Sequence, residues 1–455
     1  MRFDANSEGY RWYVVVLLLL VFILSYFDRF ILSLLIDPIK QSMGLSDFQM
    51  GLLLGPAFSI FHVLVGVPLG WVADRSSRKW LLIAGIFIWC SMTAMSGFAM
   101  SFLPLLIFRL GLGLGEAVVS PCSVSIISDY FKRKNRARAI SVYMAGPYLG
   151  AGTAFLFGGL LVAWLEQRAP IHLFGMGPFE AWQATFLLVG LPGMLAILLM
   201  LTVREPPRTE KISATAAEEA KISAFRYMLS HWRAFGVLFV GSTCNFAMST
   251  LTFWNVPLFQ RVYGWDIATI GAVTGIFYFT AGPLGTALAL WSTKALGKDR
   301  DDGAMRTLIL GLFITVPASA LYPVMPTAEL AVVFMFLAFI GKSAATAGGP
   351  AALQLITPGE MRSRSVAIFN TVITVIGPLL GPPLIGLATD WSGNPASIGV
   401  VLSGFVLVIG LPTLVIVLIG LKHYRAEATR MGESVRASEA VKAAPGATGP
   451  EPAIA

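Results

Sequence analysis

Long apolar runs alternate with short polar segments along the whole chain. Each run reaches the roughly 20 residues that a helix needs to cross a hydrocarbon core about 30 Å thick. Several runs contain glycine or proline, which spanning helices tolerate where neighbouring helices satisfy the freed backbone groups. The runs predict twelve spans, at residues 12–36, 48–72, 80–99, 103–127, 138–164, 183–203, 234–259, 267–292, 305–325, 328–354, 365–389 and 396–421. The pattern is that of an all-α membrane protein with twelve transmembrane helices.

The composition argues against a soluble protein. Of the 455 residues 56% are hydrophobic and only 13% are charged, against about 25% charged in soluble domains. The three cysteines lie in apolar spans without CxxC spacing, which indicates neither a disulfide framework nor a metal site. The sequence contains no HExxH, no G-x4-G-K-[ST] loop and no Ser-His-Asp set at matching depth. We therefore expect neither an enzyme nor an ATP-driven pump, and no cofactor besides a proton gradient.

The distribution of basic residues predicts the orientation in the membrane. With the N-terminus placed inside, 27 of the 33 Lys and Arg residues fall in inside segments. Lys40, Arg168 and Arg261 fall outside, and three more lie within spans. By the positive-inside rule both termini are cytoplasmic. This distribution also accounts for the net charge of +8 without nucleic acid as a partner.

The polar stretches divide the chain into five parts. We predict a cytoplasmic N-terminal segment, a six-helix bundle, a cytoplasmic linker, a second six-helix bundle and a largely disordered cytoplasmic tail. Their bounds are 1–11, 12–203, 204–233, 234–421 and 422–455.

The two halves resemble each other weakly but in order. A shift of 226 residues lays Gly115-Glu116 on Gly341-Lys342 and Arg136-Ala137-Arg138 on Arg362-Ser363-Arg364. Two parallel six-helix repeats around a midplane site are the plan of alternating-access transporters. The sequence therefore predicts two pseudo-symmetric six-helix bundles, although apolar sequence of low complexity also matches itself by chance.

Three charged residues inside spans are candidates for proton coupling. Arg109 and Glu116 lie two turns apart on one helix, and Asp28 lies in the first span at a depth similar to that of Arg109. Charges at bilayer depth are costly and usually face a partner or a water-filled cavity. We predict that Asp28, while ionised, holds Arg109 and that Arg109 moves between the two acids. The alternative is a packing helix with one structural ion pair.

A second set of residues is predicted to bind substrate. Lys342 is the pseudo-equivalent of Glu116, and the pair would seat a zwitterionic or phosphate-bearing head group; otherwise Lys342 extends to the membrane interface. The predicted substrate-binding residues are Arg29, Tyr26, Lys342, Asn245, Trp254 and Asn370.

The loop between the second and third spans carries a family motif. Gly70 to Lys79 reads G-W-V-A-D-R-S-S-R-K, which resembles the G-x-x-x-D-R-x-G-R-K signature of the major facilitator superfamily, with Ser77 in place of the expected glycine. A carboxylate at a helix end beside a fork of arginines suits a cytoplasmic gate. The residues predicted for this gate are Gly70, Asp74, Arg75, Arg78, Lys79, Asp129, Arg136 and Arg138.

Further motifs resemble the spinster branch of that superfamily. They are Tyr26-Phe27-Asp28-Arg29-Phe30, Arg109-x3-Gly113-x-Gly115-Glu116-Ala117 and Ser128-Asp129-Tyr130-Phe131. The resemblance implies proton-coupled alternating access for an amphipathic, lysophospholipid-like or sphingosine-phosphate-like substrate. An organic-anion/proton symporter of the anion:cation symporter branch and a hydrophobic-compound efflux antiporter are the alternatives. We expect a monomer surrounded by lipid in a bacterial inner membrane.

Overall fold

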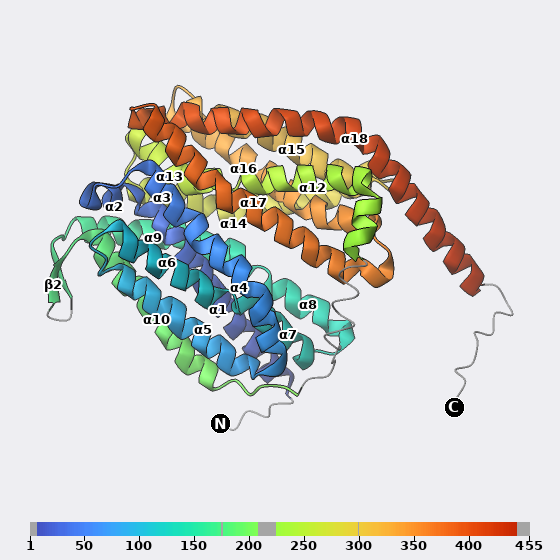
Figure 1. Cartoon of the computed structure of the whole chain (residues 1–455), viewed down its shortest axis with the longest axis horizontal. Helices are drawn as coiled ribbons and strands as arrows, with labels where there is room; N and C mark the ends of the chain where they lie inside the picture. The colour runs from blue at the N-terminus through green and yellow to red at the C-terminus, as the bar shows by residue number, and fades with distance from the viewer. Residues whose placement is uncertain (1–6, 174–175, 208–223, 299, 444–455) are drawn as a thin grey trace.

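The computed structural model describes residues 7–173, 176–207, 224–298 and 300–443. Helices make up nearly all of this part of the chain (Figure 1). The first half contains α1 (Glu8–Leu34), α2 (Ile36–Met43), α3 (Asp47–Leu54), α4 (Pro56–Arg75), α5 (Arg78–Ser96), α6 (Phe102–Glu116), α7 (Val119–Tyr130), α8 (Arg133–Tyr143), α9 (Gly146–Glu166), the antiparallel strands β1 (Ile171–Leu173) and β2 (Met176–Phe179), and α10 (Ala181–Leu201).

The second half contains the remaining helices. They are α12 (Trp232–Ala247), α13 (Thr250–Tyr263), α14 (Ile267–Leu296), α15 (Gly303–Leu321), α16 (Ala328–Leu355), α17 (Arg362–Trp391) and α18 (Ile398–Ala443), with single 3₁₀ turns at Tyr322–Val324, Gly359–Met361 and Pro395–Ser397.

These helices form the predicted twelve spans. Eleven stretches of the described chain are long and apolar enough to cross a membrane, three of them pairs of helices that continue one another: α6 with α7, α8 with α9, and α12 with α13. Helices α3 and α4 take the position of the predicted span 48–72. The all-α architecture and the twelve-helix arrangement are confirmed.

Two bundles lie side by side, one from each half of the chain (Figure 1). We call them the N-half and the C-half. They meet chiefly where α9 packs on α14 and where α3 packs on α17. Glycines make both contacts close: a Cβ at Gly271 would lie 2.6 Å from the carbonyl oxygen of Phe155, and one at Gly55 would lie 2.2 Å from that of Pro378. Small residues of this kind let membrane helices approach backbone to backbone.

The two ends of the bundles differ in what they carry. We call the end with the Ser76–Ser77 turn and the last part of α18 the terminal side, because the first helix begins and the last helix ends toward it (Figure 1). The opposite end, with α2 and the β1–β2 hairpin, is the hairpin side. On the hairpin side Gly44 and Gly264 end α2 and α13 with left-handed backbone, at φ 64° and 68°, which glycine adopts without strain.

The predicted disordered tail differs from the structure, because α18 continues without a break from the last span to Ala443. This extension is anchored to the C-half: Tyr424 Oη donates to the carbonyl of Ala352 at 2.8 Å, and Arg425 Nε lies 2.9 Å from the buried Asp302. Alanine, arginine and glutamate also favour helix, and Arg430 pairs with Glu427 one turn earlier. Residues 444–455, and residues 208–223 of the predicted linker, lie outside the described residues.

The close contact of α9 with α14 yields a stability prediction. Gly271→Ala places a methyl group against backbone, and overpacking of this kind costs about 1–3 kcal/mol. Gly404→Ala on α18 meets no atom within 4 Å and removes a helical glycine, which stabilises by roughly 0.5–1 kcal/mol. We expect thermal unfolding in detergent to occur at a lower temperature for the first variant and not for the second. Equal midpoints for both would contradict this account of the interface.

Candidate functional site

Four charged side chains meet inside the N-half, and we call them the charge cluster: Asp28, Arg29, Arg109 and Glu116. Asp28 and Arg29 lie on α1, and the other two lie on α6. Asp28, Arg109 and Glu116 are each at most 3% exposed. The side chain of Arg29 is 21% exposed. The cluster balances two carboxyl groups against two guanidinium groups, as buried charges require.

The centre of the charge cluster is an ion pair between α1 and α6. Glu116 Oε2 accepts from Arg29 Nη2 at 3.0 Å and from Ser25 Oγ at 2.8 Å. Ser25 and Arg29 are four residues apart, so both face the same neighbour along α1. The chain breaks its helix directly after Glu116, between α6 and α7. Broken helices at substrate and coupling sites recur in transporters.

Two aromatic rings hold the guanidinium of Arg29. Its Cζ lies 4.5 Å from the ring centre of Tyr26 and 3.9 Å from that of Phe58. A cation over an aromatic face is stabilised by the ring quadrupole. Tyr26 therefore contacts the cluster through Arg29, and Arg29 binds the carboxylate in the present arrangement.

The structure differs from the predicted pairing of Arg109. Its Nη1 donates to the backbone carbonyl of Asp28 at 3.3 Å, and its guanidinium lies 4.8 Å from the ring centre of Phe186. The Asp28 carboxyl faces Trp89 and Thr93 on α5 instead. The reason is helical geometry: successive residues differ by about 100°, so the turn of α1 that aims Arg29 at Glu116 turns Asp28 toward α5.

The charge cluster is incompletely satisfied by protein groups. Five of its buried atoms have no hydrogen-bond partner among the described residues: Asp28 Oδ1, Arg29 Nε, Arg109 Nε and Nη2, and Glu116 Oε1. Arg109 interacts electrostatically with both acids. Buried polar atoms without partners are uncommon in native proteins and call for an explanation. Groups that change partner or protonation during function provide one.

A second polar site lies in the C-half around Lys342 on α16. Its Nζ lies 3.4 Å from Thr252 Oγ1 and 4.6 Å from the ring centre of Phe339. Beside it is a cavity of about 20 Å³, also lined by Asn255 and Tyr322, enough for about one water molecule. Sequence reasoning missed Tyr322, whose hydroxyl lies 2.7 Å from Asn255 Oδ1.

The other predicted substrate-binding residues are divided. Asn245 belongs to this site, because its Nδ2 donates to Thr346 Oγ1 at 2.8 Å and to the Lys342 carbonyl at 3.4 Å. Trp254 is fully buried on α13. Asn370 is exposed on α17. Glu116 and Lys342 each have their own partner here, Arg29 and Thr252.

Aromatic rings connect the charge cluster with the lysine site. Phe30, next to Arg29, lies 6.0 Å from Tyr278 between ring centres, and Tyr278 lies 5.2 Å from Phe339. The ammonium group of Lys342 in turn lies over the ring of Phe339. An apolar wall therefore runs between a cation on each half.

On the terminal side, the predicted gate is centred on Arg78. Its guanidinium is buried and pairs with Asp129, with Glu205 at 3.1 Å and with the carbonyl of Pro206 at 2.9 Å. Burial opposes ionisation of Glu205, but the hydrogen bonds from Ser77 and Arg78 outweigh it and hold its pKa below the ordinary value. Glu205 lies in the linker, and sequence reasoning missed it. These contacts tie the linker to the N-half.

Two of the remaining gate residues, Lys79 and Arg138, contact other groups. Lys79 Nζ donates to the carbonyl of Leu201 at 2.7 Å. Arg138 lies 5.5 Å from the ring centre of Trp12. Arg75 is exposed and Arg136 is half-buried. The surroundings of Gly70 and the side chain of Asp74 lie outside the described part of the structure.

The hairpin side carries a network that sequence reasoning missed. Arg261 of the C-half binds Asp37 on α2, with Nε at 3.0 Å from Oδ1, and Asp47 on α3, with Nη1 at 2.9 Å from Oδ2. Lys40 pairs with Asp47 at 2.8 Å. Asp390 on α17 accepts from the backbone N–H groups of Asp47 and Phe48 at 2.9 and 2.8 Å. This hairpin-side network joins the two halves. Arg261 and Lys40 are two of the three exceptions to the positive-inside count, which was the available signal.

Comparisons with known proteins agree with this geometry. The model of the Major Facilitator Superfamily matches residues 18–300 and 238–446. The crystal structure of a bacterial homologue of the human lysosomal transporter Spinster, inward-facing and unoccupied, superposes with a TM-score of 0.77 at 27% identity, over 94% of this chain and 98% of that one.

Two curated relatives cover most of the chain as well. An MFS-type efflux pump of Mycolicibacterium smegmatis is 26% identical over 85% of this chain and 86% of its own length. A probable L-galactonate transporter of Escherichia coli is 27% identical over 71% of each chain. The chain is thus a multi-pass transporter similar to spinster proteins, and no enzyme. It belongs to the major facilitator superfamily.

Proposed function

We propose that this protein is a proton-coupled secondary transporter that moves an amphipathic, lipid-like substrate with an anionic head group by alternating access. The observation that carries the proposal is the Arg29–Glu116 ion pair inside the apolar N-half. Similarity to a bacterial Spinster homologue supports the spinster branch, and it is the resemblance to that branch that implies this substrate class. The proposed mechanism uses the proton gradient as its energy source and needs no cofactor.

Coupling follows from the two ligands that Arg29 can bind. In the present arrangement Arg29 binds Glu116. A proton on Glu116 neutralises the carboxylate and weakens its bond to Arg29, because charge-assisted hydrogen bonds are about twice as strong as neutral ones. Arg29, the most exposed member of the charge cluster, then binds the anionic group of the substrate. Proton and substrate therefore bind cooperatively.

Asp28 and Arg109 form the second part of the coupling machinery. Arg109 interacts with both acids and has two unpaired nitrogen atoms among the described residues. When Arg29 leaves Glu116, Arg109 is the cation that remains to balance the buried carboxyl groups. The proposed relay keeps Asp28, Arg109 and Glu116 and adds Arg29 as the residue that changes partner.

The wall between Arg29 and Lys342 fits an amphipathic substrate. The two cations would bind an anionic or zwitterionic head group from opposite halves. The rings of Phe30, Tyr278 and Phe339 would contact the apolar chain. Alternating access requires the substrate to bias the equilibrium between the inward-open and outward-open arrangements. A substrate that contacts both halves can do so, because the two arrangements differ in how the halves are placed.

An organic anion carried by a proton symporter is the second candidate. Two arginines in the charge cluster and a relative named as a probable L-galactonate transporter favour it. The MFS-type efflux pump is the relative that favours hydrophobic-compound efflux. An organic anion would make no use of the long aromatic wall. A hydrophobic compound would make no use of the two cations.

The orientation completes the proposal. The predicted positive-inside orientation puts the terminal side, with both termini, in the cytoplasm of a bacterial inner membrane. The hairpin-side network would then close the outer face. In this proposal the present arrangement corresponds to the inward-facing state, which is the state of the Spinster homologue with which the chain superposes. The protein acts as a monomer in this scheme.

Transport by proteoliposomes tests the function. We expect a lysophospholipid to move when a proton gradient is imposed, and to move several-fold less without it, because coupling energies of 1–3 kcal/mol correspond to about 5–150-fold. A hexonate such as L-galactonate serves as the comparison substrate in the same vesicles. If only the hexonate moves, the substrate is an organic acid and the proposed lipid-like substrate is wrong.

Substitution in the charge cluster tests the coupling. Glu116→Gln removes the proton site but keeps the side-chain shape, so gradient-driven accumulation should fall by about tenfold or more while exchange at equilibrium persists. Asp28→Asn and Arg109→Gln should act in the same direction. Glu166→Gln, at the exposed end of α9, is the matched control and should transport normally. Normal gradient-driven accumulation by Glu116→Gln would rule out the proposed coupling.

The hairpin-side network predicts how the outer face opens. Arg261→Ala leaves Asp37 and Asp47 without their cation from the other half, and breaking a buried pair costs roughly 3–5 kcal/mol. A cysteine introduced at Phe253, in a background without native cysteines, should then react several-fold faster with an impermeant maleimide added outside. Arg168→Ala removes an exposed arginine on the same side and should change nothing. Equal rates in both variants would contradict the role of the network.

A further inference from the structure

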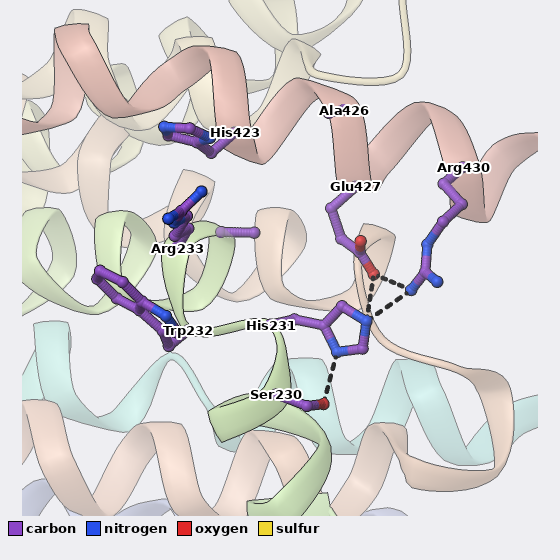
Figure 2. Close-up of a pocket in the computed structure, with 9 residues that line it drawn as sticks. Ser230, His231, Trp232, Arg233, His423, Ala426, Glu427 and Arg430 are labelled. Atoms are coloured by element: carbon purple, nitrogen blue, oxygen red, sulfur yellow. Dashed lines mark hydrogen bonds and ion pairs between the residues drawn. The ribbon is translucent and has the colours of Figure 1, made fainter.

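A polar pocket on the terminal side is separate from the charge cluster and from the lysine site. One wall is the turn into α12, Ser230 to Ala234, and the other is the extension of α18, with His423, Ala426, Glu427 and Arg430 (Figure 2). The pocket has a volume of about 450 Å³. We propose that it binds the phosphate-bearing head group of an anionic glycerophospholipid of the inner leaflet.

The depth of the pocket places it at a membrane interface. From Ile398 to Leu421 the sequence of α18 is apolar, a length of about 36 Å at a rise of 1.5 Å per residue. That length slightly exceeds a hydrocarbon core of about 30 Å. His423 to Arg430 therefore lie among the lipid head groups. Trp232, the first residue of α12, is 63% exposed beside them, as is common for tryptophan at the interface.

Hydrogen bonds hold one end of the pocket in a fixed arrangement. His231 Nδ1 lies 2.9 Å from the carbonyl of Tyr227, so Nδ1 carries the proton and Nε2 accepts from Arg430 Nη2 at 2.9 Å. Arg430 Nη2 also binds Glu427 at 2.5 Å, and Tyr227 Oη donates to the same carboxylate at 3.0 Å. Figure 2 shows these bonds between His231, Glu427 and Arg430.

The charges in the pocket favour an anion. Glu427 is nearly buried and is neutralised by Arg430, whose bonds to described residues all use Nη2. Nε and Nη1 of Arg430 remain as donors. Arg233, exposed near His423 at the opposite end of the pocket, adds a second positive charge (Figure 2). With both histidines neutral the lining carries a net charge of +1, and basic pockets at this depth suit lipid phosphates.

The surface below the pocket favours a lipid over a free phosphate. Ile419, His423, Ala426 and Arg430 follow the i, i+4, i+7, i+11 spacing and lie on one face of α18. Ile419 is 63% exposed, and Val415, one turn below it, is 54% exposed. An acyl chain along this apolar stripe leads directly to a head group between Arg233 and Arg430.

Retention of lipids by the purified full-length protein, measured by native mass spectrometry, tests the proposal. The probes are dioleoyl phosphatidylglycerol, dioleoyl phosphatidylcholine and inorganic phosphate. We expect one phosphatidylglycerol to be retained in preference to phosphatidylcholine. Arg233→Gln removes a charge without breaking a bond that holds the pocket, and Ala426→Leu fills the pocket without changing its charge. Arg233→Gln should lower retention about fivefold or more, since a basic residue near anionic lipid contributes about 1 kcal/mol. Ala426→Leu should lower it as well, because the larger side chain occupies the space of the head group.

Lys422→Gln is the matched control, because it removes one positive charge from the same turn of α18 outside the pocket. It should retain the lipid within about twofold of the unmodified protein. Equal retention of the two lipids would overturn the proposal, and so would full retention by Ala426→Leu. Displacement of phosphatidylglycerol by millimolar inorganic phosphate would assign the pocket to free phosphate. All variants should elute as the unmodified protein does, and either pocket variant alone suffices if the other misfolds.

Discussion

The fold depends on keeping four charges inside an apolar bundle. Charges at bilayer depth are expensive, and removing one partner of a buried pair is more expensive than removing both. The charge cluster solves this with one ion pair, Arg29 with Glu116, and with aromatic rings against both guanidinium groups. Five of its buried atoms lack hydrogen-bond partners among the described residues. In the proposed mechanism these unpartnered atoms allow the ion pair to change partner when a proton or an anion binds.

The joints between the two halves suit movement around such a site. Glycines bring α9 against α14 and α3 against α17, so that backbone lies close to backbone at both contacts. Charged residues tie the halves at the hairpin side, where Arg261 binds two aspartates of the N-half. On the terminal side Arg78 instead binds partners in the N-half and the linker. In this account the hairpin-side network holds the two bundles together at one face.

Sequence reasoning predicted what depends on periodicity and composition. The twelve spans, the two bundles and the burial of Asp28, Arg109 and Glu116 follow from apolar length and from the cost of charge in lipid. Choosing the partner of Glu116 was not possible in this way. The choice depends on the rotation of α1, where one residue turns the side chain by about 100° and exchanges Asp28 for Arg29.

Contacts distant in sequence were also beyond prediction. The pairing of Arg261 with Asp37 spans 224 residues, and nothing in either local sequence specifies the other. The helical tail is a related case. The charged sequence from Lys422 to Ala443 indicates disorder when it is considered alone, but contacts with Asp302 and Ala352 anchor it as a helix. Tertiary contacts decide such segments more than local propensity does.

The proposed transport mechanism depends on the exchange of Arg29 between Glu116 and the anionic group of the substrate. The most direct test is calorimetry of substrate binding in two buffers with different ionisation enthalpies, which counts the protons that bind with the substrate. A carboxylate displaced from its arginine takes up a proton, so the account predicts an uptake of about one proton per substrate, by linkage. Most proteins are stable between about pH 5 and 8. If the substrate binds throughout this range and no proton is taken up at any of these pH values, the proposed exchange of Arg29 is contradicted.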